Sequence, residues 1–163
     1  MPNRNKSEYP FVPAHLPRLL AWAMSKDCFA FMNGNRHRPL YGAFPTMVFA
    51  GSIADIRGTE RSFEKLQHFI QLHQDWLYGY LSYELKNEIE ELSSSNPASI
   101  AYEHLHFMVP ETIILIGDDK INITTVLEPD EVFDEIKNYR SVTKPKVNRL
   151  SKPFSLTSKK KIF

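Results

Sequence analysis

The sequence is poor in cysteine and has no long apolar segment. Cys28 is the single cysteine among 163 residues, so the chain cannot form an internal disulfide, and this fits a reducing cytoplasm. No run of about 18 apolar residues is present that could cross a membrane. The first residues, 1–7, lack the apolar core of a secretory signal. We therefore expect a cytoplasmic protein that is not inserted in a membrane.

Catalytic motifs are also missing. The sequence has no Gly-rich phosphate loop, no His-Glu-x-x-His, no Cys-x-x-Cys pair and no Gly-x-Ser-x-Gly elbow. His104 and His106 would share one face of a strand and could suit a metal, but a partly exposed pair of strand histidines is the simpler interpretation. Cys28 precedes an apolar run and is better explained as a small buried hydrophobe than as a nucleophile. We assign no catalytic residue and no metal ligand.

Two helical sets of polar residues have similarly simple explanations. His68 and His73 are five residues apart, too far round a helix to share a face well, so we interpret them as structural or solvated. Glu84, Glu88 and Glu91 could bind a divalent cation, but a solvated helix face is the favoured interpretation.

Charge is unevenly distributed along the chain. The net charge is +1, but residues 144–163 contain seven basic residues and no acidic one. The remaining 13 basic residues face 19 acidic ones in residues 1–143, and a mildly acidic body argues against nucleic acid as the partner. The whole chain is 42% hydrophobic, an ordinary globular composition, and we interpret 1–143 as one domain. We interpret 144–163 as a basic linker or disordered tail.

Apolar periodicity predicts strands in clusters, with helices between the clusters. That order favours an α+β fold with a largely antiparallel sheet. Three helices are expected. The first spans 15–25. The second spans 62–74, with Ser62 as its cap and with Phe63, Leu66, Phe69 and Ile70 on its buried side, and the third starts near Asp130 and buries Val132, Phe133, Ile136 and Tyr139. The expected strands are 28–32, 47–50, 53–56 and 105–116, the last joined by a hairpin turn at 117–120 to 121–126.

The most distinctive stretch runs from Trp76 to Leu92. Aromatic or apolar residues alternate on both faces of 76–83, which predicts a central strand covered from both sides. Gly79 in mid-strand suggests that another group packs closely against the backbone. From Leu85 onward the spacing becomes helical, so the strand is expected to continue into a short acidic helix.

This stretch resembles the Gly-Tyr-x-x-Tyr-Asp segment in the N-terminal domain of the chorismate-using synthases, the component I subunits of anthranilate and para-aminobenzoate synthase. Trp76, Gly79, Tyr80 and Tyr83 carry the likeness, and Glu84 stands where many relatives have Asp. The likeness is greatest to bacterial aminodeoxychorismate synthase component I and covers roughly residues 10–145, most strongly 76–92.

The resemblance implies a non-catalytic domain of a larger enzyme. In this family the chorismate pocket, the Mg²⁺-binding glutamates and the acid/base groups lie in a C-terminal domain whose motifs are absent here, so the chain alone is expected to be inactive and to hold no cofactor. The implied partners are that catalytic domain and a glutamine amidotransferase (component II) that supplies ammonia for 4-amino-4-deoxychorismate in folate biosynthesis. The alternatives are an anthranilate synthase component I fragment or a stand-alone small-molecule-binding module.

One family feature concerns feedback binding of an amino acid. Anthranilate synthases sense tryptophan through a Leu-Leu-Glu-Ser segment, whose equivalent here is Phe31-Met32-Asn33-Gly34. Asn33 and Gly34 stand at the positions of the Glu and Ser of that segment. The carboxylate that could pair with the amino group of an amino acid is therefore missing. This favours the para-aminobenzoate branch, and a strand end followed by an Asn-Gly turn explains the same residues without a ligand.

Overall fold

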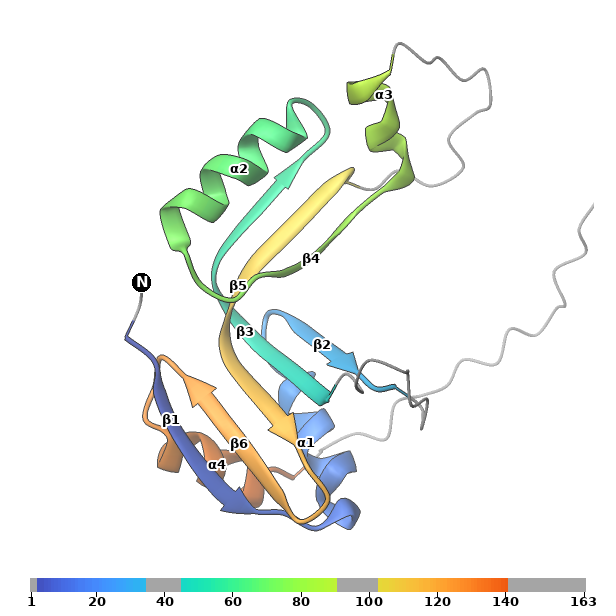
Figure 1. The fold of residues 1–163 in the computed structure, drawn as a ribbon. Helices are drawn as coiled ribbons and strands as arrows, with labels where there is room; N and C mark the ends of the chain where they lie inside the picture. Colours follow the sequence, from blue (N-terminus) through green and yellow to red (C-terminus); the bar gives the residue numbers. More distant parts are fainter. Residues whose placement is uncertain (1–2, 35–44, 91–102, 141–163) are drawn as a thin grey trace, which may run out of the picture.

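The computed structural model describes residues 3–34, 45–90 and 103–140. Within them, six strands form one antiparallel sheet with helices packed against it, which confirms the α+β prediction (Figure 1). The strands are β1 (Asn5–Pro10), β2 (Phe29–Met32), β3 (Thr46–Gly58), β4 (Tyr78–Leu81), β5 (Leu105–Ile116) and β6 (Lys120–Thr125). The helices are α1 (Leu16–Ala23), α2 (Ser62–His73), α3 (Lys86–Ile89) and α4 (Pro129–Asn138), and 3-10 turns at Pro13–His15 (η1) and Tyr83–Leu85 (η2) precede α1 and α3. The predicted tail 144–163 lies outside the described residues.

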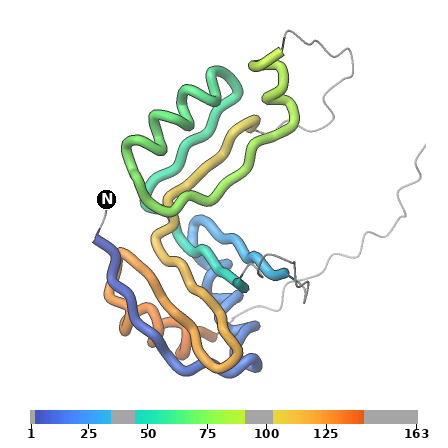
Figure 2. Tube along the Cα trace, in the orientation of Figure 1, coloured from blue at the N-terminus to red at the C-terminus, as the bar shows by residue number. Residues whose placement is uncertain are grey.

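Two long strands, β3 and β5, run the whole length of the sheet and pair with each other throughout (Figure 2). The strand order is β1-β6-β5-β3-β2, and β4 pairs with the first part of β5. Residues 46–50 of β3 and 112–116 of β5 lie in what we call the lower half, with β1, β2, β6, α1 and α4. Residues 54–58 and 105–109 lie in the upper half, with β4, α2 and α3. The chain thus places a five-stranded half beside a three-stranded one.

The sheet bends where the two halves meet. Pairing passes from Ser52 opposite Pro110 to Ala54 opposite Val109, so Ile53 is an extra residue in β3. Gly51 has a φ of 69°, a left-handed conformation that favours glycine. The prediction of two separate strands at 47–50 and 53–56 is therefore wrong. The break suggested by Gly51-Ser52 is a bend within one strand.

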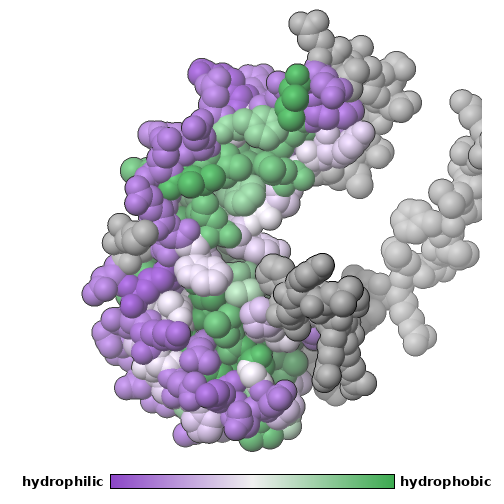
Figure 3. Space-filling model, viewed as in Figure 1, coloured by the Kyte–Doolittle hydropathy of each residue, from purple (hydrophilic) through white to green (hydrophobic). Residues whose placement is uncertain are grey.

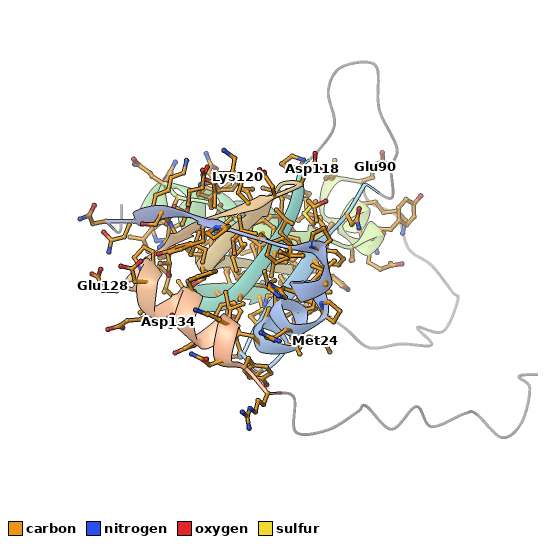
Figure 4. The ribbon with its side chains drawn as sticks, turned by 90° about the horizontal axis from the view of Figure 1, so that it is seen from below. Met24, Glu90, Asp118, Lys120, Glu128 and Asp134 are labelled. Carbon is orange, nitrogen blue, oxygen red and sulfur yellow. The ribbon has the colours of Figure 1, made fainter. Side chains whose placement is uncertain are left out.

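The lower half has a closed core under α1 and α4. Leu19 and Ala23 are fully buried there, as expected for the apolar side of the predicted 15–25 helix, and they share this core with Val48 of β3. Figure 4 looks onto this side, where α1 and α4 lie next to each other. Trp22 is 2% exposed, and its indole Nε1 donates to Glu135 Oε2 at 2.9 Å, so the polar group of this buried ring is satisfied. The predicted apolar side of the last helix is confirmed, with Val132 and Ile136 buried and Phe133 and Tyr139 half-buried.

The upper half is less completely covered. Helix α2 matches the predicted 62–74 helix and buries Phe69, but Phe63 is 40% and Ile70 46% exposed, so half of its expected buried side is wrong. Ser62 is the first residue of α2 rather than its cap. Its backbone N–H and its hydroxyl both donate to the carboxylate of Glu88, at 2.7 Å each. Glu88 therefore caps α2 from α3 and is not part of a purely solvated face.

Candidate functional site: an exposed apolar surface on the upper half

The stretch that carries the family resemblance forms an edge, which corrects the prediction of a central strand at 76–83. Strand β4 spans only Tyr78–Leu81 and, within the described part of the chain, pairs with β5 alone. Tyr80 is 42% exposed and Leu81 47% exposed. Alternation of aromatic residues indicates which side chains share a face, but it does not show whether a neighbouring element covers that face. Here neither face of β4 is fully covered.

One residue of β4 does pack inward, against the lower half. The ring of Tyr78 stacks on that of Phe49, with centroids 5.0 Å apart, and joins a small cluster formed by Ala30, Met47 and Ile113. This contact fixes the start of β4 at the bend of the sheet. The rest of the strand extends away from it.

Gly79 is required for the pairing of β4 with β5. A Cβ added there would lie 2.6 Å from both the Cα and the ring Cγ of Phe107 and would also collide with the carbonyl oxygen of His106. The close approach that a mid-strand glycine predicts is thus confirmed, and the approaching group is the Phe107 side chain with its backbone.

The acidic helix after β4 is shorter than the sequence suggests. Tyr83 and Glu84 belong to the 3-10 turn η2, and Leu85 is buried at 3% exposure. Tyr83 is 80% exposed, with the Lys86 ammonium 4.7 Å from its ring centroid. Ile89, four residues after Leu85 in the helical spacing of the sequence, is 71% exposed.

We use the name upper apolar surface for a set of apolar side chains that are exposed on the upper half. Its members are large, exposed and contributed by α2, β4, η2 and α3. They are Phe63, Ile70, Leu81, Tyr83 and Ile89. Figure 3 shows apolar side chains gathered on this half between α2 and the segment that carries β4. Exposed apolar side chains that cluster in this way are typical of a surface that another protein covers.

The β4 segment is anchored by an ion pair that sequence analysis did not find. The Arg4 guanidinium contacts the Asp75 carboxylate at 2.7 Å, with the two side chains only 10% and 8% exposed. Arg4 also donates to the carbonyl oxygens of Pro110 (2.7 Å) and Glu111 (3.2 Å) at the bend of β5. Burial alone would raise the pKa of Asp75, but hydrogen bonds from Arg4 and from the Trp76 backbone N–H outweigh it and hold that pKa below its ordinary value. Residues 71 positions apart form this pair, so no local pattern could reveal it.

The predicted amino-acid segment is divided between the two faces of the sheet. Phe31 and Met32 are in β2, and Met32 pairs with Met47, which in turn pairs with Leu115 of β5. Met47 belongs to the cluster that Tyr78 of β4 joins, whereas Phe31 packs against the core under α1 and α4. Asn33 and Gly34 are exposed beyond the end of β2. Phe31–Gly34 therefore do not share one face of the sheet, and it is Met32 that pairs with a residue of the cluster containing Tyr78.

The remaining candidate residues lie apart from one another. His106 Nε2 is 3.5 Å from Asp55 Oδ2, and its ring meets the edge of Tyr80. His73 packs on Phe69, with ring centroids 4.4 Å apart. Cys28 Sγ lies 2.9 Å from Met108 Sδ, and burial raises the pKa of this thiol. Among the residues that the structure describes, no three His, Cys, Asp or Glu side chains converge in a way that could hold a metal ion.

Comparison with known proteins adds no relative. No protein-family model matches the sequence, and no curated protein matches it. In the described residues, no helix has both the length and the apolar character needed to cross a bilayer.

Proposed function

We propose that this chain is the non-catalytic N-terminal domain of an aminodeoxychorismate synthase component I, whose upper apolar surface docks on the catalytic chorismate-binding domain. The observation that carries the proposal is the exposure of Leu81, Tyr83 and Ile89 in the segment that most resembles this family. Burying one such side chain stabilises a complex by about 1.5–3 kcal/mol, so several together suit a lasting interface.

The complete enzyme would use this domain as a scaffold, in the cytoplasm. The catalytic domain would add ammonia, supplied by a glutamine amidotransferase, to chorismate and yield 4-amino-4-deoxychorismate for folate synthesis. Mg²⁺ belongs to the chemistry of that catalytic domain. The described residues of this chain do not fit it, because Glu88 is engaged with Ser62 and Glu84 with Lys86 and Asn87. We therefore assign no reaction step to the chain.

A two-part assay tests this proposal. The 163-residue chain is incubated with chorismate, ammonium and Mg²⁺, alone and together with the catalytic domain of an aminodeoxychorismate synthase component I that lacks its own N-terminal domain. We expect no product from the chain alone and a stable complex in the mixture, measured by size-exclusion chromatography. Turnover by the chain alone would contradict the non-catalytic role, and absence of a complex would contradict the scaffold role.

A further inference from the structure

The lower half, to which no binding role has been assigned above, contains an apolar groove. It has a volume of about 530 Å³ and lies between the segment that joins β1 to α1, the turn before β6 and the last turns of α4. Its lining is apolar inside and charged at the mouth. The lining residues that carry the argument are Phe11, Ile121, Phe133 and Ile136 inside, and Val12, His15, Arg18, Asp119 and Lys137 at the mouth.

The floor of the groove is part of the lower core. Phe11, Ile121 and Ile136 are 6%, 0% and 4% exposed and all belong to the core cluster under α1 and α4. A ligand that enters the groove therefore rests on side chains that are already fixed by packing. Val12, 54% exposed, stands at the open side and has apolar surface left for a ligand to cover.

The aromatic wall of the groove is also held in place. The Phe133 ring stacks on Tyr9 with centroids 4.2 Å apart and planes 9° from parallel. The Tyr9 hydroxyl donates to Asp130 Oδ1 at 2.6 Å, which fixes the stack from the α4 side. The His15 ring meets the edge of Phe11. These rings offer a flat ligand an aromatic wall at little cost in side-chain entropy.

The mouth of the groove carries an excess of positive charge. Arg18 Nη1 donates to the carbonyl oxygen of Lys137 at 2.8 Å, so the guanidinium is held at the end of α4, and Lys137 also lines the groove. Asp119 is the acidic residue of the lining, and Lys120 next to it pairs with Glu8 at 3.0 Å. Two permanent cations against one carboxylate favour an anionic group at the mouth.

We propose that this groove binds an aromatic monocarboxylic acid, with the ring system on Phe11, Phe133 and Ile136 and the carboxylate at Arg18 and Lys137. The volume lies within the range of about 300–1,000 Å³ that is typical of small-molecule sites and holds a two-ring acid. The carboxylate supplies the charge that the mouth favours, and the rings cover apolar surface that is open to water. A polar or dianionic ligand would leave the apolar floor uncovered.

The test uses 2-naphthoate as the probe and 2-naphthamide as its uncharged match. Both are titrated into the full chain and followed by methyl NMR at Val12, Ile121 and Ile136, with Leu72 on the upper half as a distant reference. We expect saturable shifts at the three groove methyl groups and none at Leu72. Naphthamide should bind about tenfold more weakly, because it loses the charge-assisted hydrogen bonds.

Matched variants test whether Arg18 and Lys137 bind the carboxylate of the probe. Lys137→Gln and Arg18→Gln should each weaken naphthoate binding several-fold and leave naphthamide unchanged, whereas Arg61→Gln, which removes the same charge from an exposed pair with Glu64 on α2, should change neither. Lys137→Gln alone decides the result if Arg18→Gln disturbs folding. No saturable shift at the groove, equal affinity for acid and amide, or self-association through this groove in place of ligand binding would each overturn the proposal.

Discussion

The two halves of this molecule share two strands but differ in how completely they cover them. The lower half surrounds residues 46–50 and 112–116 with three further strands and two helices, and buries a cluster of eleven residues. The upper half covers residues 54–58 and 105–109 with one short strand, α2 and the single turn of α3. Of the thirteen large hydrophobic side chains exposed in the described residues, eight lie between residues 62 and 90.

This difference suggests that the lower half provides the folding stability of the chain and that the upper half provides its binding surface. The lower half can hold the fold by its own packing, because its apolar groups are already buried. The upper half leaves apolar groups in water, which is unfavourable unless a partner covers them. The stability of the chain should therefore depend on the lower half and on the anchor at the bend, and binding should depend on the upper half.

The Arg4–Asp75 ion pair at the bend should give the largest effect. Arg4→Ala leaves a buried carboxylate without its partner and two carbonyl oxygens without a donor, and should lower the free energy of unfolding by about 3–5 kcal/mol at pH 7. Arg57→Ala, which breaks an exposed pair with Asp55, should cost less than about 1 kcal/mol. Urea unfolding measures both, and equal effects would contradict the role of the anchor.

The same ion pair predicts a dependence on pH. The pKa of Asp75 is lower in the folded state than in the unfolded state, so its contribution is complete above the unfolded pKa, about 3.9, and is lost as the pH falls through the folded value. Arg4→Ala should therefore destabilise strongly at pH 7 and progressively less as the pH falls below about 4, where Asp75 becomes protonated first in the unfolded chain and then, below its lowered pKa, in the folded wild type. A difference between wild type and variant that stays constant from pH 7 to pH 3 would contradict this.

Core truncation should distinguish the halves. Leu19→Ala removes a fully buried side chain from the lower core and should cost about 2–5 kcal/mol. Leu81→Ala truncates a leucine that is 47% exposed on β4 and should cost about 1 kcal/mol or less, since little apolar contact is lost. Thermal unfolding of both variants measures this, and a larger loss from Leu81→Ala would reverse the comparison.

The cap between α3 and α2 should give a smaller effect. Glu88→Gln keeps the shape but weakens the acceptance of the Ser62 N–H and hydroxyl, at a cost of about 1 kcal/mol. Burial opposes ionisation of Glu88, but the hydrogen bonds from Ser62 prevail and lower its pKa, so this contribution too should disappear in acid. Asn87→Gln, one residue away and exposed, is the control. Amide exchange at the start of α2 should rise only in Glu88→Gln.

The spacing of apolar residues along the chain predicts most of the helices and strands, because the formation of such an element depends mainly on residues that are close in the sequence. The helices that bury Leu19 and Val132 and the strand 105–116 with its hairpin follow from apolar spacing and turn residues. The sequence predicts a break at Gly51 where the structure has a bend, since a glycine in a strand is compatible with either.

The candidate site was predicted less well, for a physical reason. The pattern of 76–83 correctly places Gly79 against its neighbour but cannot show that β4 is an edge, which depends on what else the chain folds beside it. The contacts of Glu88 with Ser62 and of Arg4 with Asp75 join residues 26 and 71 positions apart. Such pairs are set by the tertiary fold and leave no periodic signal.

Titration calorimetry of the catalytic domain of an aminodeoxychorismate synthase component I against this chain tests the central claim most directly. Phe63→Lys places a charge on the upper apolar surface, and Leu72→Lys places the same charge on an exposed leucine about two and a half turns further along α2, hence on its opposite side. We predict that wild type and Leu72→Lys bind alike and that Phe63→Lys binds at least about tenfold more weakly, because losing a buried phenylalanine costs about 1.5–3 kcal/mol. Equal binding by all three proteins, or no binding by any, would contradict the assignment of this surface as the docking site.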